Sequence, residues 1–206
     1  MLVTPSMYFP GDRSYDIPLL DKSFQPSLIN LPLIPWGSQS KSKFMPGTWH
    51  FYVEDQKFDS LWRNPNSLLD SRSNSIIEPN WTIELSCPRA VVLYQVYRKR
   101  FLSRYWQTHG ISCYVDLNVH LDFMEYNLIG VPQGWRAYAC RGSWDIEGLL
   151  TRWAIAKSHA QTEDILFIVY AGGKDVINLC QMHGWCHFPT YRGPDRYKGV
   201  VNHGGI

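Results

Sequence analysis

The chain has 206 residues, of which 45% are hydrophobic and 18% charged, so it can bury a sizeable core and is not a disordered protein. Lysine and arginine number 20 against 18 acids, and a net charge of +2 excludes a strong overall attraction to nucleic acid or to anionic membranes. The odd set of five cysteines, the lack of a signal pattern and the lack of an apolar run of roughly 20 residues predict a soluble, cytoplasmic protein with reduced thiols and no membrane partner.

Residues 1–47 are rich in proline and serine. The prolines come too often for a helix to survive, but apolar residues at 17–20 and 28–36 predict an arm that packs on the domain. Residues 48–190 are predicted to form a single domain. The tail, residues 191–206, has glycine and charge but little to bury, so we expect it to be flexible unless a partner orders it.

From residue 48 the pattern becomes regular. Strands are predicted at 49–54, 75–78, 111–117, 136–140, 164–170 and 185–188, and helices at 56–63, 88–109, 122–127, 144–160 and 174–183. Gly110 is expected to end the long helix, because glycine tolerates the left-handed conformation found there. The alternation predicts an α/β fold with a mainly parallel sheet, and right-handed crossovers would wrap that sheet into a small or partial barrel.

Polar side chains follow several of these strands. They are Glu54, Asp55, Glu78, Asn80, Asp116, Asn118 and Arg141. The carboxyl ends of parallel strands share one edge, so residues far apart in sequence can meet in one pocket. The carboxylates could gather a divalent cation such as Mg²⁺, which prefers oxygen ligands, although no specific metal site is defined. The alternative for each is helix capping or a salt bridge.

The helix at 88–109 places Arg98 on an apolar face. With about 100° per residue, Arg98 shares this face with Tyr94, Phe101 and Tyr105. A buried arginine needs an anion, so Arg98 either holds a phosphate or pairs internally with Glu54, Asp55 or Glu78, and the internal pair is slightly favoured. Lys99, Arg100 and Arg104 are predicted to form a solvated basic flank, which can still touch a nucleic-acid backbone.

Two further motifs have both a functional and a structural interpretation. Cys180, His183, Cys186 and His187 have spacing similar to that of zinc ligands, but a helix followed by a strand cannot point all four at one metal, and buried structural cysteines are favoured. Gly172-Gly173 before a helix could approach a phosphate closely, or could form a tight turn, which is favoured.

Several segments resemble a family of domains of unknown function found in phages, plasmids and bacterial genomes. They include Leu33-Ile34-Pro35-Trp36, His50–Phe58, Leu61–Pro65, Ile77–Asn80, Tyr97–Arg100, Tyr105–Gln107, Gly130–Gly134 and Ile168–Tyr170, in order over about residues 31–173. The resemblance implies that Asp55, Phe58, Trp62, Arg98 and Arg100 occupy characteristic positions, and it suggests mobile-element biology.

The chain departs from the family pattern at three places. Asn80 stands where the family usually has aspartate, which weakens an inherited metal site. Val115–Val119 replace a Pro-Asn-x-Arg-Trp sequence, and Arg141-Gly142 replace a small residue followed by glycine. The resemblance implies no particular activity.

The leading hypothesis is a nucleic-acid-binding or nucleic-acid-processing (replication-type) protein of a plasmid or phage. Glu54, Asp55 and Glu78 are the candidate catalytic groups, and Arg98, Arg100 and Arg141 are the candidate phosphate ligands. The alternative is a non-catalytic interaction or structural protein of a mobile element that meets a protein partner through aromatic surface. A third possibility, supported only by Gly172-Gly173, is an enzyme acting on a small phosphorylated metabolite.

Overall fold

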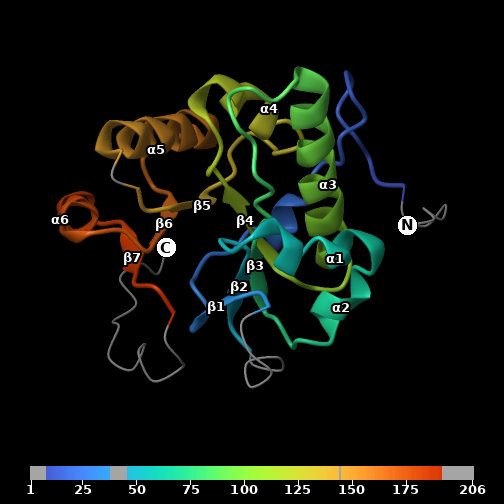
Figure 1. Cartoon of the computed structure of the whole chain (residues 1–206), viewed down its shortest axis with the longest axis horizontal. Helices are drawn as coiled ribbons and strands as arrows, with labels where there is room; N and C mark the ends of the chain where they lie inside the picture. The colour runs from blue at the N-terminus through green and yellow to red at the C-terminus, as the bar shows by residue number, and fades with distance from the viewer. Residues whose placement is uncertain (1–7, 38–45, 144, 192–206) are drawn as a thin grey trace.

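The chain folds into a single sheet of seven parallel strands that nearly closes into a barrel (Figure 1). The computed structural model describes residues 8–37, 46–143 and 145–191. The strands are β1 Leu33–Pro35, β2 Thr48–His50, β3 Ser75–Ile77, β4 Ser112–Asp116, β5 Ala137–Arg141, β6 Leu166–Tyr170 and β7 Cys186–Phe188. Their order in the sheet equals their order in the chain, as repeated right-handed β-α units produce. The predicted α/β fold with a parallel, barrel-like sheet is confirmed.

Helices follow five of the strands and lie outside the sheet (Figure 1). The helices are α1 Ser60–Arg63, α2 Asn66–Leu69, α3 Arg89–Gln107, α4 Met124–Asn127, α5 Ile146–Ala160 and α6 Lys174–His183. Gly110, at φ +84°, follows the end of α3 as predicted. Among the described residues, no helix is long and apolar enough to cross a membrane.

The strands are buried on both faces, which explains their continuous apolar runs. In β6 all five residues, Leu166–Tyr170, are buried. The outward residues of β2 to β4, such as Trp49 and Ile76, pack with Phe101 and Trp106 of α3. Inside the sheet, the rings of His50 on β2 and Tyr170 on β6 have centroids 4.0 Å apart. Since β3, β4 and β5 separate these strands in the sheet, this contact crosses the barrel interior.

The N-terminal arm is part of this architecture. Its residues Leu33–Pro35 form β1, which pairs with β2, so the sheet begins earlier than the predicted domain start at residue 48. Further along the arm, the Leu28 carbonyl accepts a 2.6 Å hydrogen bond from the Tyr114 hydroxyl. The predicted flexible tail lies outside the described residues from 192 onward.

Two buried ion pairs join α3 to the ends of β3 and β4. Lys99 lies 3.2 Å from a carboxylate oxygen of Asp116, and Arg100 pairs with Glu78. Both partners of the Arg100 pair are fully buried. Arg100 also donates to the carbonyls of Asn127 and Ile129, and the second Glu78 oxygen accepts from the Asp116 backbone N–H at 3.1 Å. The prediction of a solvated flank is therefore wrong for Lys99 and Arg100, because both are needed to neutralise buried acids.

We expect Glu78→Gln to lower the free energy of unfolding by about 3–5 kcal/mol, because it leaves the buried Arg100 charge without its counterion. The control is Glu54→Gln, which removes an exposed pair with Lys57 and should cost less than about 1 kcal/mol. Urea denaturation of the parent and both variants measures the free energies of unfolding. The dependence of this free energy on urea concentration should be the same in all three proteins. Equal losses in the two variants would contradict the structural role of Glu78.

Candidate functional site

The carboxyl ends of β2 to β5 do meet at one pocket, with a cavity of about 380 Å³. Its polar lining comes from Tyr52, Asp55, Asn80, Thr82, Glu84, Asn118, His120, Arg141 and Arg152, and its apolar lining from Val53, Ile83, Leu85 and Val119. These residues follow the strand ends, except Arg141, which is the last residue of β5, and Arg152, which comes from α5. The parallel topology therefore gathers segments about 100 residues apart, as the strand-end argument predicts.

Asp116 organises the floor of this pocket. Its carboxylate accepts hydrogen bonds from the Tyr52 hydroxyl and the Asn118 backbone N–H, each at 3.0 Å, in addition to its pair with Lys99. Burial raises the pKa of the Asp116 carboxyl, and the Lys99 ammonium opposes that shift. Burial and the neighbouring Asp116 also raise the pKa of Tyr52, so Tyr52 stays a hydrogen-bond donor. Asp116 thus fixes the pocket floor without being exposed to the pocket itself.

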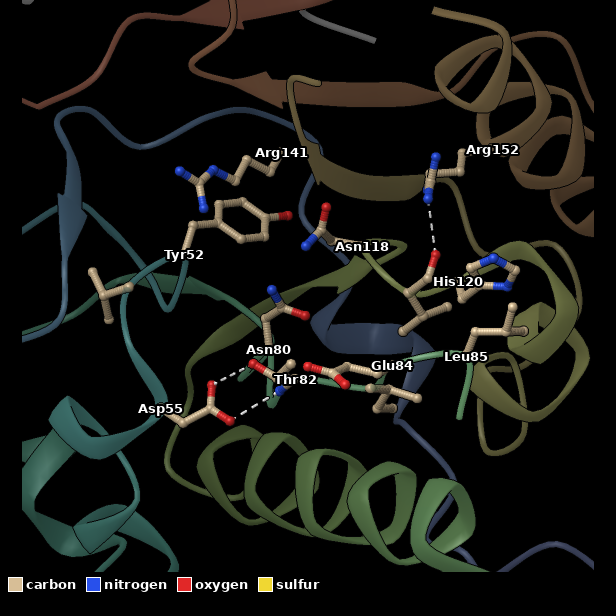
Figure 2. Close-up of a pocket in the computed structure, with 13 residues that line it drawn as sticks. Tyr52, Asp55, Asn80, Thr82, Glu84, Leu85, Asn118, His120, Arg141 and Arg152 are labelled. Atoms are coloured by element: carbon tan, nitrogen blue, oxygen red, sulfur yellow. Dashed lines mark hydrogen bonds between the residues drawn. The ribbon is translucent and has the colours of Figure 1, made fainter. Parts of the chain in front are cut away.

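Two asparagines stand between the walls of the pocket (Figure 2). The Asn80 amide satisfies its neighbours when its nitrogen faces Asp116 Oδ2 at 3.2 Å and the Asn118 carbonyl at 3.0 Å. In that orientation its oxygen accepts from Asn118 Nδ2 at 2.9 Å. Asn80 therefore links Asn118 to Asp116, and the Asn118 side-chain oxygen, which has no hydrogen-bond partner among the described residues, can meet a ligand.

The predicted acidic groups do not assemble into one cluster. Glu54 is exposed and pairs with Lys57, while Glu78 is sequestered with Arg100. Asp55 lines the pocket, and its two oxygens accept from the Thr82 N–H at 3.0 Å and the Thr82 hydroxyl at 3.2 Å (Figure 2). Among the described residues, no three His, Cys, Asp or Glu side chains are grouped to hold a metal ion. The hypothesis that Glu54, Asp55, Glu78 and Asp116 gather one cation is wrong for this geometry.

Arg98 is buried outside the pocket. It pairs with Asp59, not with Glu54, Asp55 or Glu78, and its guanidinium lies 3.9 Å from the Trp81 ring centroid. The hydrogen bond from Arg98 lowers the pKa of Asp59. The favoured internal pair is therefore found, but with a partner that the sequence argument did not consider. The stacking on Trp81 explains how a charge is tolerated on this aromatic face.

Arg141 reaches the pocket from the last residue of β5. Among the described residues, its side chain has no hydrogen-bond or ion-pair partner. The other pocket arginine, Arg152, is occupied, since it donates to the carbonyls of Leu117 at 3.1 Å and Val119 at 2.9 Å. Figure 2 shows Arg141 beside Tyr52, on the side away from Asp55 and Glu84. One wall of the pocket is thus cationic and the other acidic.

The cysteine and histidine motif lies at the C-terminal end of the sheet, with Cys180 and His183 on α6 and Cys186 and His187 on β7. Cys180 is buried, His183 stacks on Trp185 with ring centroids 5.0 Å apart, and a ring nitrogen of His187 lies 3.0 Å from the Ala171 carbonyl. These three side chains have separate protein environments. Gly173 precedes α6 and Gly172 has φ +102°, as a tight strand-to-helix turn requires.

A sequence profile for a domain of unknown function, DUF4417, matches residues 9–140. The chain belongs to the DUF4417 family. The matched segment includes the pocket residues as far as His120, and Arg141 follows directly after its end. No solved structure matches the chain significantly.

Two phage proteins are similar to this DUF4417 chain. The Gene 1 protein of Mycobacterium phage D29 is 26% identical over 138 residues, and that of Mycobacterium phage L5 is 28% identical over 136 residues. Each match covers 62% of this chain, with 48% of the D29 protein and 57% of the L5 protein. The chain therefore spans about half the length of these relatives. They make this a phage-related protein of unknown function.

Some pocket residues of this DUF4417 protein escaped sequence reasoning. Thr82, Glu84 and His120 lie in segments after the strands, and Arg152 lies nearly two turns into α5. Their position shortly after the ends of β3 and β4 is the signal that could have drawn attention to Thr82, Glu84 and His120. Arg152 carries no such signal, because its place depends on how α5 packs beside the segment after β4, where Arg152 donates to the Leu117 and Val119 carbonyls.

His50 lies inside the barrel next to Tyr52 and Tyr170. Its Nδ1 accepts from the Tyr52 backbone N–H at 3.3 Å, and the ring is fully buried. Burial, with a smaller effect of the Arg141 charge, lowers the pKa of His50 from 6.5 to about 3. The folded protein therefore keeps this ring neutral at pH values where the unfolded chain protonates it.

The stability that neutral His50 contributes is present above pH 6.5 and is lost as the pH falls toward 3, because the unfolded state then binds one more proton. We expect His50→Gln to reduce the slope of unfolding free energy against pH in this range by up to about 1.4 kcal/mol per pH unit. Urea denaturation between pH 4 and 7 measures this slope. The control His109→Gln changes an exposed histidine and should keep the parent's slope of unfolding free energy against pH. The same slope in His50→Gln and in the parent would contradict the prediction.

Proposed function

We propose that this protein binds single-stranded nucleic acid at the barrel-mouth pocket, with a phosphate held by Arg141. The observation that carries the proposal is the Arg141 guanidinium, which has no partner among the described residues and lies on the wall of a pocket that also presents several hydrogen-bonding side chains. A guanidinium presents parallel N–H donors that match two phosphate oxygens. Similarity to phage proteins supports a substrate from mobile-element biology.

The size of the pocket supports a single strand. A cavity of about 380 Å³ lies in the lower range of small-ligand sites, and it admits one nucleotide but not a duplex. With a net charge of +2, few phosphates can be neutralised, so binding is expected to be moderate and to depend weakly on salt.

The remaining pocket groups suit the neutral parts of a nucleotide. The Asn118 amide can accept from a base edge, and Asp55, with lone pairs beyond those used by Thr82, can accept from a sugar hydroxyl. Asp55 is the one carboxylate of the predicted catalytic set that lines the pocket. If the bound strand is also processed, Asp55 is one group placed to take a proton.

A second candidate function is binding of a protein partner without catalysis. It is favoured by exposed apolar side chains near the start of α3, where Leu85 is 57%, Val91 41% and Tyr94 50% exposed. This surface does not include Arg141, so a variant of Arg141 separates the two functions.

We expect Arg141→Met to weaken binding of a fluorescent six-nucleotide strand about 10- to 100-fold, because it removes a charge-assisted contact of about 1.5–3 kcal/mol. The matched control is Arg136→Met, which changes an exposed arginine just before the opposite end of the same strand. Fluorescence anisotropy with DNA and RNA at 50 mM salt, with and without Mg²⁺, is the measurement.

The dependence of affinity on salt gives a second readout. Loss of one phosphate contact should reduce the slope of log K against log salt by about 0.7 in Arg141→Met and leave it unchanged in Arg136→Met. Absence of binding by the parent protein, or equal weakening in the two variants, would refute the nucleic-acid proposal and favour the protein partner.

A further inference from the structure

A second cavity adjoins the pocket. It measures about 350 Å³ and is lined by Asn118, Arg141, Gly142 and Ser143. Two of these residues, Asn118 and Arg141, also line the first cavity. The two spaces therefore meet at the one pocket arginine that has no partner among the described residues.

Local backbone packing creates the second cavity. A Cβ placed on Gly142 would lie 2.4 Å from the Ala171 carbonyl, so a side chain there would push the loops after β5 and β6 apart. The Gly142 N–H donates to the Tyr170 carbonyl at 2.7 Å, which keeps the two loops together. The Ser143 hydroxyl accepts from the Asp145 N–H at 3.2 Å, and its hydrogen remains available to a ligand.

The charges fix where an anion can sit. Asp55 and Glu84 line the first cavity and would repel a phosphate on their side. Arg152 is engaged with the Leu117 and Val119 carbonyls. A negative charge is therefore best placed at Arg141, between the two cavities, with neutral groups extending to either side.

We propose that the ligand unit of this site is a dinucleotide, with its internal phosphodiester on Arg141 and one nucleoside in each cavity. A dinucleoside monophosphate has one negative charge between two neutral units, so its phosphate can meet the Arg141 guanidinium while an uncharged nucleoside occupies each cavity. This inference rests on the proposed nucleic-acid function and specifies it. A site of this kind recognises an internal phosphodiester of a strand, whereas a mononucleotide site would bind a terminal phosphate.

The test compares dinucleoside monophosphates with the corresponding nucleoside 5′- and 3′-monophosphates by isothermal titration calorimetry. The parent protein should bind the dinucleoside monophosphate at least about tenfold more tightly than either mononucleotide, because only the dinucleotide fills both cavities. Arg141→Met should weaken the dinucleoside monophosphate about tenfold or more. A pyrophosphate-linked pair of nucleosides, with two charges and a longer linkage, should bind more weakly.

Ser143→Leu fills the second cavity. It should lower the ratio of dinucleotide to mononucleotide affinity to about one, while the control Ser158→Leu, at an exposed serine near the far end of α5, should keep the parent ratio. Thermal unfolding of both variants shows that they are folded. The parent's own affinity ratio tests the proposal even if Ser143→Leu is unstable.

The outcomes separate this inference from the proposed function. If longer single strands bind but the dinucleotide binds no better than mononucleotides, the dinucleotide inference is overturned and the nucleic-acid function stands. Tighter binding of the pyrophosphate-linked compound than of the dinucleoside monophosphate also overturns the inference. If no strand or nucleotide binds, both fail. A dinucleotide that binds tightly but is insensitive to Arg141→Met also overturns the inference.

Discussion

The barrel mouth depends on two adjacent cations of α3 that are buried against the strand ends. Lys99 and Arg100 neutralise Asp116 and Glu78, and the Asp116 backbone N–H bonds to Glu78, so the two pairs form one connected unit. Removing one charge from such a unit leaves another uncompensated in a medium of low polarity. The helix and the ends of β3 and β4 are therefore held in a single arrangement, which specifies the site above them.

Asp116 connects these buried ion pairs to the pocket. Its carboxylate holds the Tyr52 hydroxyl, the Asn118 backbone and, through Asn80, the Asn118 side chain. A floor that is already hydrogen-bonded loses little entropy when a ligand arrives. Arg141, in contrast, has no protein anion among its described neighbours, and this difference separates the groups that build the pocket from the group offered to a ligand.

The sequence predicted most of the fold because its signals are local. Gly110 marked the end of α3, and the apolar run 166–170 marked a buried strand. The strand β1 was missed because prolines obscure three apolar residues that pair only through tertiary structure. At the site, the sequence correctly predicted Asp55 at the pocket. Helical periodicity wrongly predicted that Arg100 is exposed to solvent. Periodicity does not reveal which polar face is covered by other parts of the chain, and here α4 and β3 cover it.

The central claim is that the carboxyl edge of the barrel is a binding site organised around Arg141. A crystal structure with a short single-stranded oligonucleotide tests it most directly. We expect a phosphodiester group on the Arg141 guanidinium, with nucleosides on both sides of it in the cavities that share Asn118. An oligonucleotide bound elsewhere on the protein, with Arg141 paired to a carboxylate of the chain itself, would contradict a binding site organised around Arg141.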